Sequence, residues 1–121
     1  MQAGQRAAIA YIAGRLVTGV DGRSVFDRAA RDIKRYSGEV SEHQVDIFDY
    51  QRQHHVAGNV AGDTIELYDY ASGTHLVCQL AGDQFRGFDQ ASRHRYEGRV
   101  QGRHISLYDY ETRARYDYDL R

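Results

Sequence analysis

The sequence contains no proline and no tryptophan, and Cys78 is its only cysteine. A single cysteine excludes an internal disulfide and any zinc site built from several cysteines. Because proline is absent, every residue can donate to a β-ladder, which suits central strands. No apolar run approaches the roughly 20 residues of a membrane-spanning helix, and the start lacks the long apolar core of a secretory signal. We therefore expect a cytoplasmic protein without a transmembrane segment.

The charges nearly cancel, since 16 basic and 17 acidic residues give a formal net charge of −1. This balance provides no general field that would attract nucleic acid, so we expect no nucleic-acid partner. A chain of 121 residues predicts one domain, over residues 1–121, that can bury its own core without a metal.

A repeat of 20 residues dominates the chain. A Phe-Asp or Tyr-Asp pair recurs at 48–49, 68–69, 88–89 and 108–109, and each pair follows a short apolar motif by ten residues. Four regular repeats therefore span 38–57, 58–77, 78–97 and 98–117, and 118–121 is expected to be the end of a closing strand. The N-terminal segment 1–37 carries a divergent copy.

Within each repeat, apolar and polar residues alternate with a period of two, which indicates two short antiparallel strands. Gly62-Asp63 and Gly82-Asp83 suit the tight turns of hairpins. The sequence thus predicts an all-β fold: an antiparallel meander of about ten short strands, closed into a shallow barrel with approximate four-fold symmetry. Residues 24–37 could form an amphipathic helix, but Phe26 and Asp27 fit the repeat and favour strands. For 6–17, strand and helix both remain open.

Five aspartates occupy one position of the repeat, and a basic residue follows about six positions later. We expect each aspartate to accept backbone N–H bonds in a turn and to pair with that basic residue across the hairpin. The aspartates are Asp27, Asp49, Asp69, Asp89 and Asp109.

Candidate binding residues come from two other positions of the repeat. Tyrosines two residues beyond the first aromatic residue can stack on sugar rings or face a protein, and exposed basic residues can hold an anion. The candidates are Tyr50, Tyr70, Tyr110, His55, His75, Arg95 and Arg115. The six histidines lie at unrelated repeat positions, so no metal site is predicted, and no motif indicates a catalytic residue or a cofactor.

The pattern Gly-x-Val-x-Gly-x-x-Ile-x-Leu-Tyr-Asp-Tyr, at 58–70 and 98–110, resembles the β-flower proteins, small bacterial domains of serial hairpins around a shallow barrel. That resemblance implies a closed all-β fold, no settled activity, and lipid or membrane-proximal binding through the barrel. The segments 95–109 and 108–120 are also similar to MORN repeats and to Tyr-Asp hairpin repeats, and the period is similar to that of choline-binding repeats.

Together these features predict a non-catalytic binding or scaffold module for an apolar or anionic ligand, a lipid or a protein partner. One alternative is a carbohydrate or cell-surface binder that uses the tyrosine stripe, and another is a small enzyme. A last strand with an open edge could pair with a second chain, so a homodimer is a further expectation.

Overall fold

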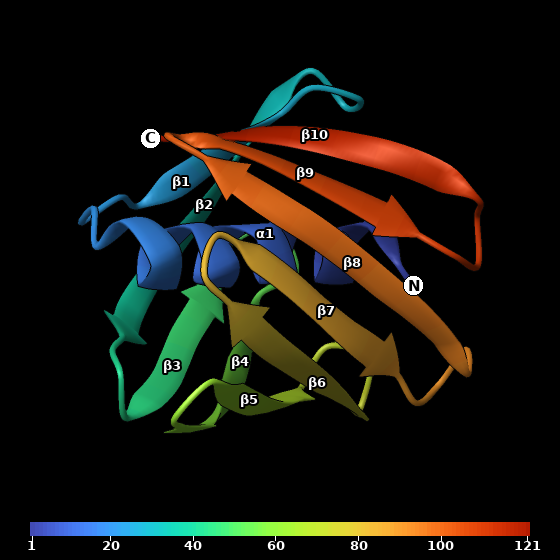
Figure 1. The fold of residues 1–121 in the computed structure, drawn as a ribbon, viewed down its shortest axis with the longest axis horizontal. Coiled ribbons are helices and arrows are strands. Elements are labelled where there is room, and N and C mark those ends of the chain that lie inside the picture. Colours follow the sequence, from blue (N-terminus) through green and yellow to red (C-terminus); the bar gives the residue numbers. More distant parts are fainter.

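The computed structural model describes residues 1–121 and consists of one helix followed by ten antiparallel strands (Figure 1). The elements are α1 (Ala3–Thr18), β1 (Ser24–Asp27), β2 (Asp32–Val40), β3 (Gln44–Asp49), β4 (His54–Ala61), β5 (Thr64–Asp69), β6 (Thr74–Ala81), β7 (Gln84–Asp89), β8 (His94–Gln101), β9 (His104–Asp109) and β10 (Ala114–Leu120). Each strand pairs with its neighbours along the chain, and β1 pairs with β10. The predicted closed β-meander is confirmed.

Short turns keep consecutive strands adjacent. Gly62 and Gly82 each adopt a φ of 63° as the first residue of a two-residue turn, where a side chain would be strained. The strands also extend into the divergent segment, because 24–27 and 32–40 form β1 and β2. The preference for strands over a helix at 24–37 is therefore confirmed.

Side chains alternate between the barrel interior and the outer surface. In β5, Ile65, Leu67 and Asp69 are buried while Glu66 between them is exposed. The same pattern in β3 and β9 directs apolar side chains inward from all around the barrel.

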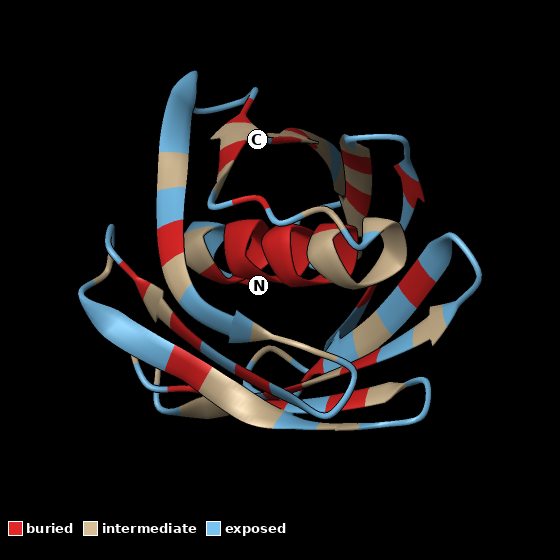
Figure 2. Ribbon diagram, turned by 90° about the vertical axis from the view of Figure 1, so that its left-hand side faces the viewer, coloured by how far each residue is buried: buried red, intermediate tan, exposed pale blue.

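The barrel surrounds helix α1. Figure 2 shows the helix lying across the middle of the molecule, with strands on both sides of it. Every residue from Gln5 to Gly14 is buried. The helix is rich in alanine, which favours helix formation and has a small side chain. It ends at Gly19, which has a φ of 69° and whose N–H donates to the carbonyl of Arg15 at 2.9 Å. The segment 6–17 is thus helical.

Helix α1 fills the space that an apolar ligand would need inside the barrel. Its Ile9, Tyr11 and Ile12 belong to the same apolar core as Ile105 and Leu107 of β9. An apolar ligand in the barrel axis would have to displace these side chains, so a ligand site must be sought elsewhere.

Closure of the barrel also corrects one expectation about assembly. Strand β10 is hydrogen-bonded to β9 on one side and to β1 on the other, so the last strand has no open edge. A homodimer formed by strand addition at β10 is therefore not available to this fold. No helix of the structure is both long enough and apolar enough to cross a bilayer.

Candidate functional site

The five repeated aspartates are buried at the ends of their strands and shape the turns. In Asp49, Oδ1 accepts the backbone N–H groups of Gln51 and Arg52 at 3.1 and 3.2 Å. Equivalent bonds reach Asp27, Asp69, Asp89 and Asp109 from the N–H group two residues further on. The predicted role as turn acceptors is confirmed.

The predicted pairing of these aspartates with the following basic residues is wrong. In the β3–β4 hairpin, Asp49 lies opposite His54, and His55 lies opposite Phe48. Because neighbouring residues of a strand point to opposite faces, His55 lies on the outer surface and Asp49 in the interior. The same register sets Arg115 opposite Tyr108.

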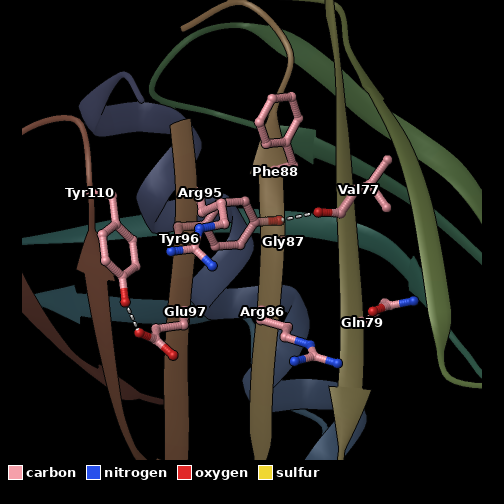
Figure 3. Close-up of a pocket in the computed structure, with 9 residues that line it drawn as sticks. All are labelled: Val77, Gln79, Arg86, Gly87, Phe88, Arg95, Tyr96, Glu97 and Tyr110. Carbon is pink, nitrogen blue, oxygen red and sulfur yellow. Dashed lines mark hydrogen bonds between the residues drawn. The ribbon is translucent and has the colours of Figure 1, made fainter. Parts of the chain in front are cut away.

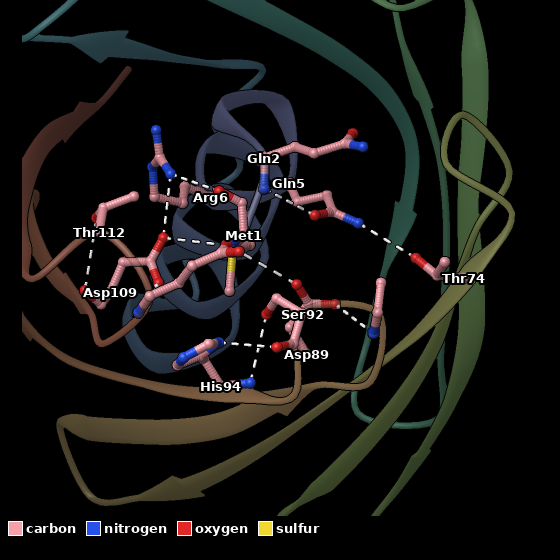
Figure 4. A network of polar contacts seen from close by, with 12 residues as sticks. Met1, Gln2, Gln5, Arg6, Thr74, Asp89, Ser92, His94, Asp109 and Thr112 are labelled. Carbon is pink, nitrogen blue, oxygen red and sulfur yellow. Dashed lines mark hydrogen bonds and ion pairs between the residues drawn. The ribbon is translucent and has the colours of Figure 1, made fainter.

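Three of the aspartates instead pair with a cation inside the barrel through their other carboxylate oxygen, Oδ2. These are Asp49, Asp69 and Asp109. Arg52 bridges Asp49 and Asp69, with N–O distances of 2.6 and 2.8 Å. At the N-terminal end of α1, Arg6 donates to Asp109 at 3.1 Å, and the amino group of Met1 lies 3.4 Å from the same carboxylate (Figure 4). Asp109 thus fastens the start of α1 to the barrel wall, and Arg52 joins Asp49 to Asp69, so the burial of these aspartates is explained without any ligand.

A groove on the outer surface brings together the side chains best suited to bind a ligand (Figure 3). It has a volume of about 410 Å³ and crosses β6, β7 and β8. Its lining residues are Val77, Gln79, Arg86, Gly87, Phe88, Arg95, Tyr96, Glu97 and Tyr110. We call it the outer groove.

Strand register places the outward-pointing side chains of the outer groove in two rows. Phe88 lies between Val77 and Arg95, which gives one row an apolar surface that ends in a guanidinium group. In the second row, Arg86 lies between Gln79 and Glu97. A flat apolar surface therefore lies beside two guanidinium groups.

The two arginines of the outer groove are free to meet an anion. Neither Arg86 nor Arg95 forms an ion pair, although arginine is well suited to pair with carboxylates and phosphates. Glu97, which lies opposite Arg86, instead accepts a hydrogen bond from the Tyr110 hydroxyl. That bond raises the pKa of Tyr110, so the hydroxyl remains a donor. The Arg95 guanidinium lies 4.9 Å from the centre of the Tyr110 ring.

A departure from the repeat opens the outer groove. In three repeats the first aromatic residue is covered by a tyrosine two residues later, with ring centres 4.6 Å apart for Tyr68 and Tyr70. The residue that follows Phe88 by two is Gln90, so no ring covers Phe88. Phe88 is accordingly an exposed side chain, with 40% of its surface accessible, whereas the equivalent Tyr68 is half-buried.

The floor of the outer groove is equally specific. Gly87 stands where Leu67 and Leu107 point inward in other repeats. A Cβ atom at position 87 would lie 2.3 Å from the Tyr96 ring, because that ring passes over the glycine. The Tyr96 hydroxyl then donates to the carbonyl of Val77 at 2.8 Å. This bond joins β8 to β6 beneath the outer groove.

Comparison with known proteins does not extend this description. No family model, curated protein or solved structure matches the chain. Function must therefore be inferred from the geometry itself.

The candidate residues from the sequence are spread around the barrel instead of forming one site. Tyr110 and Arg95 meet in the outer groove, and Tyr70 and His55 line another hollow with Asp46. The remaining candidates have local contacts. Tyr50 donates to Ser37 at 3.1 Å, His75 packs edge-on against Tyr68, and Arg115 pairs with Asp117.

Sequence reasoning missed Arg86, Phe88 and Glu97, because it looked for positions that the repeats share. The available signal lay in the differences between repeats: glutamine at 90 where other repeats have tyrosine, and glycine at 87 where others have leucine or isoleucine. No group of three or more histidine, cysteine, aspartate or glutamate side chains is arranged to hold a metal ion.

Proposed function

We propose that the protein is a non-catalytic binding module, and that its outer groove takes a small ligand with an anionic group attached to a flat apolar body. The observation that carries this proposal is the pair of arginines without ion pairs beside the exposed Phe88 ring: Arg95 lies opposite Phe88 on β8, and Arg86 lies two residues away on β7. Guanidinium groups bind phosphate and carboxylate oxygens through paired hydrogen bonds. The ring offers a stacking surface for the rest of the ligand.

The two parts of the ligand are tested by calorimetric titration with phenyl phosphate, inorganic phosphate and phenol. Phenyl phosphate carries both the anion and the ring, whereas each of the other compounds carries one. We expect phenyl phosphate to bind more tightly than either. Equal affinity for phenyl phosphate and inorganic phosphate would contradict a role for Phe88.

Variants then locate the site. R86Q/R95Q should weaken phenyl phosphate binding at least tenfold, because each charged hydrogen bond contributes about 1.5–3 kcal/mol. R35Q is the matched control, since Arg35 occupies the equivalent position to Arg95, is exposed and has no ion pair. Equal binding by both variants would place the ligand elsewhere.

Q90Y is a second variant that tests the shape of the outer groove without removing a charge. The new tyrosine should pack against Phe88 as Tyr70 packs against Tyr68, and so occupy the stacking surface. We expect binding of phenyl phosphate to fall about tenfold while the melting temperature stays level or rises. Unchanged affinity would show that the ligand does not use the Phe88 ring.

Carbohydrate binding through tyrosines is a second candidate function. Tyr50 and Tyr70 are 48% and 56% exposed and occupy the same position of neighbouring repeats. Their hairpins are two strands apart, which is about 10 Å and suits successive sugar rings. A glycan array should then give signals that Y50A/Y70A loses and R86Q/R95Q keeps. An array without signals would contradict this candidate.

A further inference from the structure

The small net charge conceals two oppositely charged walls of the barrel. Residues 39–83 include eight acidic residues and one basic residue, a formal charge of −7. Residues 84–115 include seven arginines and four acidic residues, a formal charge of +3. Asp49, Asp69, Asp89 and Asp109 are buried inside the barrel, and without them the two segments carry formal charges of −5 and +5.

The acidic wall consists of six exposed carboxylates on the segment that runs from the end of β2 to the turn before β7. These are Glu39, Glu42, Asp46, Asp63, Glu66 and Asp83. The basic wall consists of seven exposed arginines from β7 to the start of β10. These are Arg86, Arg93, Arg95, Arg99, Arg103, Arg113 and Arg115.

The charges of the basic wall are left unpaired within the molecule. Among its seven arginines, only Arg115 forms an ion pair, with Asp117 at 3.1 Å. The two exposed carboxylates on this wall, Glu97 and Glu111, instead contact the Tyr110 hydroxyl and the amino group of Met1. Six guanidinium groups therefore face solvent without a carboxylate.

The acidic wall likewise lacks arginine and lysine partners. Its only ion-pair contacts are with histidines, between Glu42 and His43 at 3.5 Å and between Asp46 and His55 at 3.3 Å. Glu39 lies directly opposite Asp46 in the β2–β3 pairing. Like charges in that arrangement destabilise a sheet, so the fold itself gains nothing from this concentration of charge.

The two walls meet beside β7, where the Asp83 carbonyl accepts the Val100 N–H at 2.7 Å and where Asp63 and Arg86 line one hollow, but their centres lie on different sides of the barrel. Strand β3 carries Asp46, strand β8 carries Arg95 and Arg99, and the two strands are five positions apart in the ring of ten. Figure 1 shows β3–β5 on one side of α1 and β8–β9 on another. One molecule therefore presents a negative surface and a positive surface in different directions.

We propose that a second copy of this chain docks its acidic wall on the basic wall of the first. Six free guanidinium groups match six exposed carboxylates, and every copy supplies both walls. Because the two walls lie on different sides, the contact joins unlike surfaces, and further copies can add in the same way. Closure of the barrel leaves no strand edge for another route. Arg86 and Arg95 belong to both the basic wall and the outer groove, but the proposal does not depend on a ligand.

Analytical ultracentrifugation at several protein concentrations, in about 20 mM and about 500 mM NaCl, tests this inference. At low salt the average mass should rise with concentration above the 13.8 kDa of one chain. At high salt it should return to that value, because screening weakens contacts between exposed charges. A single chain under all conditions, or association that salt does not reverse, would overturn the proposal.

Charge-reversal variants identify the surfaces. R99E/R113E lowers the formal charge of the seven basic-wall positions from +7 to +3 without touching the outer groove, and E39R/E66R changes that of the six acidic-wall positions from −6 to −2. Each variant alone should associate more weakly at low salt than the unmodified protein, and a mixture of the two should associate more strongly than either alone, because each retains the full wall that the other needs.

R31E/R35E is the matched control. It changes the net charge by the same amount as R99E/R113E but lies outside the basic wall, so its association should persist. Far-ultraviolet circular dichroism confirms that each variant is folded. If R31E/R35E weakened association as much as R99E/R113E, or if the mixture associated no more strongly than either variant alone, the contact would not be the one proposed.

Discussion

Removal of the Asp69 carboxylate tests whether the buried aspartates hold the barrel together. Asp69 is completely buried, and its Oδ2 accepts bonds from Arg52 at 2.8 Å and from the Ser72 hydroxyl at 2.7 Å. Its Oδ1 accepts the N–H of Ala71. The turn contact alone would contribute about 1 kcal/mol, as helix caps do.

The contact with Arg52 raises the expected cost of D69A. Breaking a buried ion pair costs about 3–5 kcal/mol when the remaining charge has no other partner. Arg52 keeps Asp49 at 2.6 Å, so its charge stays partly compensated. We therefore expect D69A to lower the free energy of unfolding by about 2–4 kcal/mol.

Urea denaturation followed by tyrosine fluorescence measures this change. D46A is the control, because Asp46 lies on the outer surface and contacts only His55 at 3.3 Å. Its cost should be below about 0.5 kcal/mol. If D69A cost no more than D46A, the assignment of the buried carboxylates as structural anchors would be wrong.

Three further substitutions or labelling experiments test the packing and the turns. A Cβ atom on residue 98 would lie 2.2 Å from the carbonyl oxygen of Ser106, so G98V should lower the melting temperature much more than C78G; equal losses would contradict the tight contact. Arg93 has a left-handed φ of 61° at the position that Gly73 occupies in the preceding repeat. R93G should therefore stabilise the fold by about 0.5–1 kcal/mol, and G73R should destabilise it. Thermal melts that gave the opposite signs would refute this. Burial raises the pKa of the Cys78 thiol to about 12. A thiol reagent at pH 8 should therefore label the unfolded chain and leave the folded chain unlabelled. Equal labelling rates would show that the thiol is accessible in the folded protein.

Much of the barrel could be predicted from the sequence, because each repeat shows the alternation of a strand and the glycine of a turn. Alternation such as Ile65, Glu66, Leu67 indicates which side of a strand is buried, and glycine at 62 and 82 marks where the chain must turn. Asp69 could also be recognised as a turn acceptor. Its ion pair with Arg52 could not, because the two residues come from different hairpins.

The location of α1 could not be predicted for a related reason. A helix that packs against one surface shows apolar residues every three or four positions, whereas α1 is enclosed on all sides and has no polar face over Gln5–Gly14. Its sequence therefore gives no periodic signal to separate a helix from a strand. The error over His55 arose from register, because a shift of one residue moves a side chain to the other face.

The outer groove escaped prediction because it exists where the repeat is broken. Gln90 leaves Phe88 uncovered, and Gly87 admits the Tyr96 ring beneath it. Repeated positions mainly report what each hairpin needs to fold. Departures from the repeat at neighbouring positions are a better guide to a site in a protein of this kind.

The most direct test of the proposed function is a titration of ¹⁵N-labelled protein with phenyl phosphate, followed by amide chemical shifts. We predict saturable shifts centred on the amides of Gly87, Phe88 and Arg95, which are kept in R35Q and lost in R86Q/R95Q. Shifts that centre on other strands, or that persist unchanged in R86Q/R95Q, would contradict the claim that the outer groove is the binding site.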